Sequence, residues 1–309
     1  MKLKFLYLCC IPTLGAADFE VRDETAFSKC VASEARIQKL AGEMKFTEGP
    51  TWLGGKDGHL VFSDIPSNEL KKWTAKEGVT RFRQPSQNTN GNTIDLDGRL
   101  VSAEHTARRI SRTGDDGRVE TVVERYEGKK FNSPNDVVVK SDGTMWFTDP
   151  PYGLPKGEAK ELDGHYVFRH DPKSGRTSLV ARDQEMPNGL AFSPDEAKLF
   201  VADSGKPHQI WSYEVKPDGD LANGRVFCVI DKGGPDGIRV DVESRVWSSA
   251  GDGVHIFSPD GILVGKVLCP ESPANLCFGG AEGKTLFLTA RTSLYSIPVR
   301  VAGARAAKR

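Results

Sequence analysis

Short runs of β-branched and aromatic residues, separated by turns rich in Gly and Asp, recur along most of the chain. The stretch SPNDVVVKSDGTMWFTDP, residues 133–150, shows the pattern: one apolar run, an Asp-Gly turn and a second apolar run. Such a unit is typical of a β-hairpin. Helical periodicity is absent downstream of about residue 40, and only residues 25–40 could hold a helical segment. The pattern predicts an all-β protein.

Six hairpin segments of this kind share one plan. They open at Glu48, Asn90, Asn135, Asn188, Asp236 and Asn275, which we term the six opening residues. The intervals between them range from 39 to 53 residues, a period typical of propeller blades when it carries β patterning. We predict a six-bladed β-propeller with four-stranded antiparallel blades over residues 41–300, flanked by an N-terminal extension (18–40) and a C-terminal tail (301–309). Residues 35–44 are expected to supply the outer strand of the last blade and so remove an exposed edge.

The predicted fold gives the opening residues a common location. The first strand of each propeller blade lines the central channel, and the second strand returns to the face on which the first began. The six opening residues should therefore meet at one mouth of the channel. The residues that close the hairpins are expected to join them there: Asp64, Glu104, His105, Asp149 and Asp203.

A ring of this composition suits a hard divalent cation. Clustered carboxylates in a poorly solvated mouth raise one another's pKa, and a cation relieves the repulsion. Ca²⁺ takes oxygen ligands, asparagine oxygens among them, whereas Zn²⁺ prefers His and Cys. We expect one divalent metal, with Ca²⁺ favoured and Mg²⁺, Mn²⁺ or Zn²⁺ left open. At any single position, the alternative is a residue that forms a turn or caps backbone groups.

The overall charge gives no reason to expect a polyanionic partner. The 309 residues include 42 Lys and Arg and 42 Asp and Glu, so the formal net charge is zero. Neither nucleic acid nor an anionic membrane is favoured by such a balance. We expect a small-molecule partner and a monomer or weak homodimer. The basic end of the chain, from Arg300 to Arg309, is expected to be a solvated tail.

The first 17 residues have the layout of a secretory signal peptide. Lys2 and Lys4 precede an apolar run, and Gly15 and Ala17 supply small side chains at its end. The run is too short to span a bilayer. We expect cleavage near Ala17 and export to the periplasm or the medium. A lipid-modified Cys10 is the alternative.

Four cysteines follow this segment. They are Cys30, Cys228, Cys269 and Cys277. Export would permit disulfides, and Cys269 with Cys277 is the nearest pair. Buried free thiols are the alternative. The sequence contains no CxxC or Cys/His spacing of a metal site.

Six stretches of the chain match the motifs of one known family. They are FTEGPTW, VFSDIPSNELKKW, PSQNTNGNTIDLDGRLVSAEH, NSPNDVVVKSDGTMWFTDPPYG, PNGLAFSPD and GPDGIRVD. On these motifs, from about residue 39 to residue 295, the sequence resembles the SMP-30/gluconolactonase/luciferin-regenerating-enzyme-like family of six-bladed propellers. It looks most like the exported bacterial gluconolactonase-type members.

The resemblance implies a divalent metal in the channel and roles for particular residues. The family's metal ligands match Glu48 of the EGP motif, Asn188 of the NGL motif and Asp236 of the PDG motif. Asp236 also matches the family's base, and Asn135 matches a residue that contacts metal or substrate. Some animal members carry an Arg two residues before that Asn, where this chain has Ser133, so substrate recognition is not carried over.

The hypothesis for function is metal-dependent hydrolysis of a gluconolactone-like sugar lactone. The metal polarises the lactone carbonyl, and Asp236 takes a proton from the attacking water. Asn90, His105 and Asn135 are the candidate substrate contacts, although His105 could equally be a structural residue of the rim. Arg108 and Arg109 either pair with the product carboxylate or lie on a solvated strand edge.

Two other functions remain open from the sequence. One is a different metal-dependent hydrolase that acts on esters or phosphotriesters, since a fold does not determine a function. The other is a non-catalytic sugar-binding propeller with a structural metal. The chain has no GxSxG element, Cys/His nucleophile arrangement or phosphate-binding loop, which argues against covalent acyl-enzyme and nucleotide chemistry.

Overall fold

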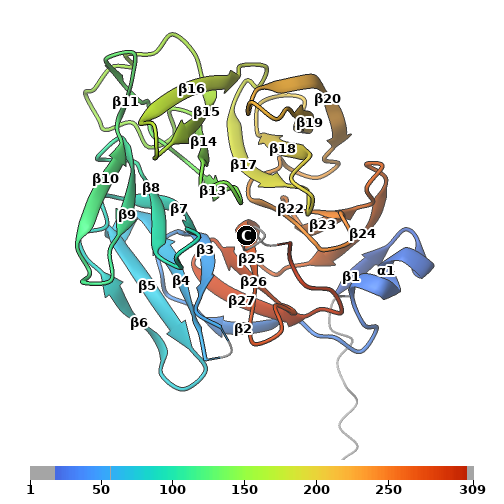
Figure 1. Ribbon diagram of the computed structural model, residues 1–309. Coiled ribbons are helices and arrows are strands. Elements are labelled where there is room, and N and C mark those ends of the chain that lie inside the picture. Colours follow the sequence, from blue (N-terminus) through green and yellow to red (C-terminus); the bar gives the residue numbers. More distant parts are fainter. Residues whose placement is uncertain (1–17, 56, 305–309) are drawn as a thin grey trace, which may run out of the picture.

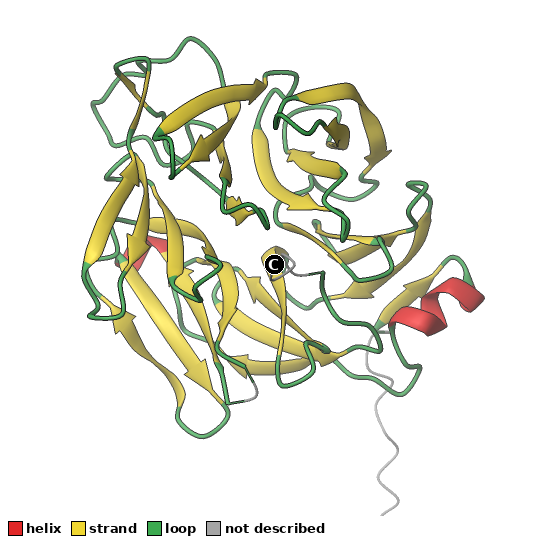
Figure 2. Ribbon diagram, viewed as in Figure 1, coloured by secondary structure: helices red, strands yellow, loops and turns green. Residues whose placement is uncertain are grey.

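Six antiparallel sheets surround a central channel (Figures 1 and 2). The computed structural model describes residues 18–55 and 57–304. Each sheet has four consecutive strands or their equivalent, with the first strand of each on the channel. The predicted six-bladed β-propeller with four-stranded blades is therefore confirmed. The predicted signal peptide lies outside the described residues.

The strands follow the chain blade by blade. Blade 1 is β3 (Thr47–Leu53), β4 (His59–Asp64), β5 (Glu69–Thr74) and β6 (Gly78–Arg83), with the short 3-10 helix η1 (Ile65–Ser67). Blade 2 is β7 (Thr89–Ile94), β8 (Leu100–Glu104), β9 (Arg109–Thr113) and β10 (Val119–Val123). Blade 3 is β13 (Val137–Val139), β14 (Met145–Asp149), β15 (Tyr166–Asp171) and β16 (Arg176–Ala181), preceded by the hairpin β11 (Arg125–Tyr126) and β12 (Lys129–Lys130). Blade 4 is β17 (Pro187–Phe192), β18 (Lys198–Asp203), β19 (Gln209–Val215) and β20 (Leu221–Val229).

The last two blades take strands from the N-terminal part of the chain. Blade 5 is β21 (Ile238–Val240), β22 (Val246–Ser249), β23 (Gly253–Phe257) and β24 (Leu263–Leu268), with β1 (Phe19–Val21) added at its outer edge. Blade 6 is β25 (Pro273–Gly279), β26 (Thr285–Ala290) and β27 (Ser293–Pro298), completed by β2 (Gln38–Ala41). The pairing of β2 with β27 closes the ring where expected, and the helical segment is the short α1 (Glu24–Cys30), capped by the Asp23 side chain.

The blades are held together by apolar side chains that interdigitate between neighbouring sheets. Between blades 2 and 3, Ile110 packs in one buried cluster with Phe147 and Phe168, whose ring centroids lie 5.5 Å apart. Each such side chain contributes on the order of 1.5–3 kcal/mol when it is buried. Because both faces of most sheets are covered in this way, second strands such as β14 (MWFTD) and β18 (KLFVAD) are apolar and buried over most of their length.

Glycine follows the opening residue in four blades and sets how closely adjacent blades approach. These glycines are Gly49, Gly91, Gly189 and Gly237. The Gly189 amide donates to the Asp236 carbonyl over 3.0 Å, and a Cβ atom at Gly189 would lie 2.4 Å from that oxygen. The Gly91 amide donates in the same way to the Asn135 carbonyl over 2.8 Å. Backbone contact between blades thus fixes the spacing of the opening residues.

The aspartates that close three of the hairpins accept hydrogen bonds from backbone amides and do not form a cation site at the mouth of the channel. Asp149 accepts hydrogen bonds from the amides of two consecutive residues, at 2.7 and 2.9 Å, in the loop that leads into its own blade. Asp64 and Asp203 accept equivalent pairs of amide bonds in blades 1 and 4. Glu104 binds Arg109 and Ser111. The expectation that these four join the opening residues is wrong, because their oxygens are used by neighbouring donors.

Residues 301–304, the described part of the expected solvated tail, are packed against the propeller, and the rest of that tail lies outside the described residues. Val301 is buried, and residues 302–304 pair with the inner strand of blade 5: the Val242 amide donates to the Ala302 carbonyl, and the Ala304 amide donates to the Val240 carbonyl. This segment runs toward the middle of the ring (Figure 1). Extended backbone beside an unpaired strand edge gains hydrogen bonds and covers that edge.

Other features of the described residues can be stated briefly. The four cysteines are free thiols, so no disulfide joins Cys269 to Cys277. Within residues 18–55 and 57–304, no helix has the length and apolar character needed to cross a membrane.

Candidate active site

A cavity of about 660 Å³ opens at one end of the channel, where the inner strands begin. We call this end the upper mouth. Five of the six opening residues line it: Glu48, Asn90, Asn135, Asn188 and Asp236. The sixth, Asn275, is buried behind the wall and donates from Nδ2 to Glu48 Oε2 over 2.9 Å. The convergence predicted from the repeat is thus observed for five side chains.

Three asparagines form a hydrogen-bonded chain around the floor of the cavity. Asn90 donates from Nδ2 to Asn135 Oδ1 over 2.6 Å, and Asn135 donates from Nδ2 to Asn188 Oδ1 over 2.7 Å. Asn188 donates in turn to Ser204 Oγ over 2.9 Å, and Ser204 donates to the Pro235 carbonyl over 2.6 Å. The chain fixes the orientation of each amide, and each amide oxygen keeps a second lone pair.

The two carboxylates of the floor lack a cationic partner. In the described part of the chain, no Lys or Arg forms an ion pair with Glu48 or Asp236; Arg291 influences Asp236 only as a more distant charge. Burial and then the neighbouring negative charge of Asp136 raise the pKa of Asp236 to about 7. Burial, Asp236 and Asp136 raise the pKa of Glu48 well above its usual value. Such an arrangement is costly unless a cation or a proton is shared.

His105 lies in the wall of the cavity, as predicted. It follows β8, is buried, and places Nε2 3.3 Å from Asn90 Nδ2. Burial lowers its pKa to about 4, opposed by hydrogen bonding with Asn135. The imidazole is therefore neutral near pH 7 and presents a hydrogen-bonding group, not a charge, to a ligand.

Several residues of the cavity were missed from the sequence. The wall also contains Ile65, Ser204 and Tyr152. Ile65 and Ser204 directly follow the residues that close hairpins in blades 1 and 4, and His105 does so in blade 2. The repeat therefore contained a usable signal, since the position after the closing residue faces the upper mouth. Tyr152 belongs to the long loop after β14, for which the repeat offers no pattern.

The two arginines considered as product contacts are used elsewhere. Arg108 is buried, and its Nη1 donates to Glu158 over 2.6 Å while its Nε donates to the Phe131 carbonyl. Arg109 pairs with Glu104 over 2.7 Å. Neither side chain lines the upper cavity. Arg108 is therefore neither a product contact in this cavity nor part of a solvated strand edge, because it is buried and anchors a loop.

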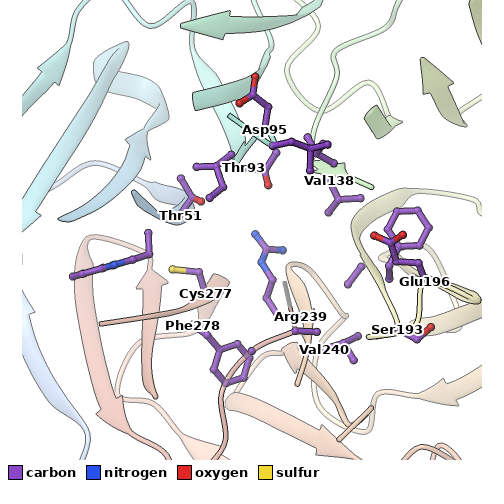
Figure 3. Close-up of a pocket in the computed structure, with 18 of the residues that line it drawn as sticks. Thr51, Thr93, Asp95, Val138, Ser193, Glu196, Arg239, Val240, Cys277 and Phe278 are labelled. Carbon is purple, nitrogen blue, oxygen red and sulfur yellow. The ribbon is translucent and has the colours of Figure 1, made fainter. Parts of the chain in front are cut away.

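The opposite end of the channel, the lower mouth, contains a second and smaller cavity of about 230 Å³. Figure 3 shows Arg239 extending into it, with Asp95 and Glu196 at its edges. Asp95 is paired with Arg99 over 2.9 Å, and Glu196 with Lys140 over 3.2 Å. Gly303 and Ala304 of the C-terminal segment form part of its wall.

The donor set of the upper mouth fits a hard divalent cation. The described residues contain no group of three or more His, Cys, Asp or Glu side chains arranged to hold a metal. The upper mouth instead combines two unpaired carboxylates with asparagine oxygens, a composition suited to Ca²⁺ or Mg²⁺ and poorly suited to Zn²⁺. The residues that would hold the ion are Glu48, Asn135, Asn188 and Asp236.

Comparison with known proteins places these features in a family. Residues 46–292 match the model of the SMP-30/gluconolactonase/LRE-like region. The chain is 35% identical to a gluconolactonase of Zymomonas mobilis over an alignment that covers 86% of this chain and 82% of that protein. It is 26% identical to a 6-deoxy-6-sulfogluconolactonase of Pseudomonas putida, with 78% and 82% covered. The solved structure of a gluconolactonase from Xanthomonas campestris superposes with a TM-score of 0.86 and 35% identity, covering 92% of this chain and 95% of that one.

Proposed function

The chain belongs to the SMP-30/gluconolactonase/LRE-like family. We propose that it is a lactonase that hydrolyses a sugar lactone to the sugar acid with the help of one divalent metal. The observation that carries the proposal is the pair of buried carboxylates, Glu48 and Asp236, without cationic partners on the floor of a solvent-open cavity. A lactone is a cyclic ester, so the activity is that of a carboxylic ester hydrolase. The gluconolactonase relatives support this class of substrate.

Metal dependence is the part of the proposal that rests on the donor chemistry. A divalent ion held by Glu48, Asn135, Asn188 and Asp236 would supply Lewis-acid polarisation of the lactone carbonyl. Ca²⁺ is the favoured ion because amide and carboxylate oxygens dominate the set. The same ion would relieve the repulsion that raises the pKa values of Glu48 and Asp236.

Different side chains of the cavity have different roles in the proposed reaction. Asp236 accepts a proton from the attacking water. Asn90 and the neutral imidazole of His105 line the same wall and hold the lactone by its oxygens. Asn135 links them to the floor through its bond with Asn90. Orientation of lactone and water in one cavity removes much of the entropic barrier to attack.

The test is a turnover assay with metal-stripped protein. Glucono-1,5-lactone is added, and acid release is followed while Ca²⁺, Mg²⁺, Mn²⁺ or Zn²⁺ is supplied singly. We expect release above the spontaneous rate only with a metal, and Ca²⁺ among the effective ions. Release that is equally fast without metal would remove metal dependence from the proposal and leave the lactonase assignment.

A panel of other substrates decides between the remaining alternatives. Unchanged lactone in every metal condition would direct the assay to esters and phosphotriesters. Binding of a sugar acid without turnover of any substrate would indicate a non-catalytic sugar-binding propeller and contradict the lactonase proposal.

A further inference from the structure

Tyr152 lines the upper cavity but has no part in the reaction described above. It lies on the loop between β14 and β15 and is 46% exposed. Among the Phe, Tyr and Trp residues in the described ranges, it is the one that is exposed rather than buried or half-buried. An aromatic side chain open to solvent at the edge of a binding cavity is a common feature of ligand contact.

The start of this loop is held in place beside His105. Ser133 Oγ donates to the Pro150 carbonyl over 2.7 Å and accepts from the Gly153 amide over 3.0 Å. Gly153 lies so close to the imidazole that a Cβ atom there would be 2.0 Å from His105 Nδ1. The backbone on either side of Tyr152 is therefore fixed by a buried serine and a buried histidine.

The rest of the loop is also anchored. Buried Arg108 donates to Glu158 over 2.6 Å, and the Lys130 amide donates to Glu161 over 2.8 Å. Leu162 is buried against the core between blades 2 and 3. The loop is thus a fixed wall, and a fixed side chain loses little entropy when a ligand binds to it.

The hydroxyl of Tyr152 faces the site. It lies close to Ser204 and Asn188, which border the same cavity. A phenol can donate one hydrogen bond and accept another. The proximity to Ser204 and Asn188 places the side chain toward blade 4. Blade 1, which lies across the ring of six blades from blade 4, contributes the apolar residues Phe46, Ile65 and Pro66 to the same cavity.

We propose that Tyr152 is a substrate-contacting residue that selects lactones with hydroxylated rings, its hydroxyl bonding a ring hydroxyl of the lactone and its aromatic ring forming the wall against which the lactone lies. The proposal rests on the lactonase function proposed above and names the substrate class of that site. The hydroxyl lies near Ser204 and Asn188 at the border of the cavity, so a lactone hydroxyl can bond to it while the lactone carbonyl faces the floor. An unsubstituted lactone would contact only the aromatic ring.

The experiment separates the two parts of the side chain. We would measure kcat/KM for glucono-1,5-lactone and for unsubstituted δ-valerolactone with the metal-loaded protein and its variants Tyr152→Phe and Tyr152→Ala. Loss of one hydrogen bond should lower kcat/KM of Tyr152→Phe for the sugar lactone about ten-fold and leave δ-valerolactone within about two-fold. Tyr152→Ala should lower kcat/KM for both substrates. The matched control is Tyr126→Phe, since Tyr126 lies on β11 away from the upper cavity.

A binding measurement keeps this proposal distinct from the lactonase proposal. D-Gluconate carries the same hydroxyls as the lactone, and its affinity can be measured by calorimetry even if no lactone is turned over. Tyr152→Phe should weaken gluconate binding about ten-fold while the affinity for Ca²⁺ is unchanged. Equal loss for both lactones in Tyr152→Phe, or unchanged gluconate affinity, would overturn the role of the hydroxyl. Failure of the wild-type protein to hydrolyse any lactone, with gluconate binding still dependent on Tyr152, would overturn only the lactonase function.

Discussion

Acidic side chains lie at both mouths of the channel, but only those at the lower mouth are paired with cationic side chains in the described chain. At the lower mouth, Asp95 and Glu196 are paired with Arg99 and Lys140, and the C-terminal segment covers part of the opening. At the upper mouth, Glu48 and Asp236 have no such partners in the described chain, and the cavity is open. The two ends belong to the same six strands, so the fold alone does not determine which end is reactive.

A candidate reactive carboxylate is identified by its lack of a cationic partner and not by its presence at a mouth of the channel. A paired carboxylate has its charge offset by a nearby cation, which favours its ionised form. An unpaired one in a poorly solvated cavity costs stability until a cation, a proton or a substrate satisfies it. Asp136 lies between the ends and shows an intermediate state, because Arg239 approaches it at 3.5 Å from the lower cavity.

The largest expected effect comes from removing one carboxylate at each end. Asp236→Asn should lower kcat/KM for a sugar lactone by at least about 10³-fold, because it removes the base and the negative charge of one metal ligand. Asp95→Asn should leave kcat/KM of the folded protein within about two-fold. Steady-state kinetics on both variants, with circular dichroism to verify folding, make the comparison. Comparable losses in both variants would mean that the ends do not differ as described.

The next effect concerns the covering of the lower mouth. Truncation after Arg300 removes buried Val301 and the backbone pairing of residues 302–304 with blade 5. We expect the free energy of unfolding to fall by about 2–4 kcal/mol, with unchanged kcat/KM below the transition. Denaturant unfolding and kinetics on the same preparation measure both quantities. A large fall in kcat/KM of the folded truncated protein would show that the lower mouth takes part in the reaction.

The affinity for Ca²⁺ should depend on pH through the ionisation of Asp236 at the upper mouth. The pKa of Asp236 is raised to about 7 in the metal-free protein, so a proton competes with the cation below that pH. Between pH 8 and pH 6 the affinity for Ca²⁺ should fall about ten-fold, with proton release on binding near pH 7. Calorimetry in two buffers of different ionisation enthalpy measures both.

The same raised pKa sets a stability trend of definite sign. The folded protein binds the Asp236 proton more tightly than the unfolded chain, so this contribution to stability is present at low pH and lost as the pH rises through about 7. Metal-free protein should therefore gain more stability from added Ca²⁺ at pH 8 than at pH 6. The opposite order would contradict the proposed coupling of proton and metal.

The smallest effect tests the orientation of the asparagine chain. Ser204→Ala removes the acceptor of the Asn188 amide, and we expect the affinity for Ca²⁺ to fall about two- to five-fold because Asn188 is less well oriented. Thr93→Val, which changes the lining of the lower cavity, should leave that affinity unchanged. Titration of each variant with Ca²⁺ provides the measurement.

Much of this architecture could be predicted from the sequence because it is repeated. The hairpin period predicted the six blades, and the shared position of the opening residues predicted the convergence of Glu48, Asn135, Asn188 and Asp236. The closing aspartates were assigned wrongly at the mouth, because sequence cannot distinguish a free carboxylate from one that accepts backbone amides, as Asp149 does.

The features that sequence reasoning missed depend on contacts that occur once. The sequence around Arg108 is typical of a solvated strand edge, but in the structure Arg108 pairs with Glu158 of the long loop after β14. Tyr152 is on the same loop, which has no counterpart in the repeat. Residues 302–304 resemble a solvated tail, and their pairing depends on the free edge of β21 lying within reach. Local pattern does not encode such long-range contacts.

The most direct test of the account is the location of a bound cation. Crystals of the protein equilibrated with Mn²⁺ and D-gluconate would be used to calculate an anomalous difference map. The account predicts one strong peak in the upper cavity, in contact with Glu48 and Asp236, with gluconate density beside it. A peak among Asp95, Glu196 and Arg239 at the lower mouth, or no peak at the upper mouth under saturating Mn²⁺, would contradict it.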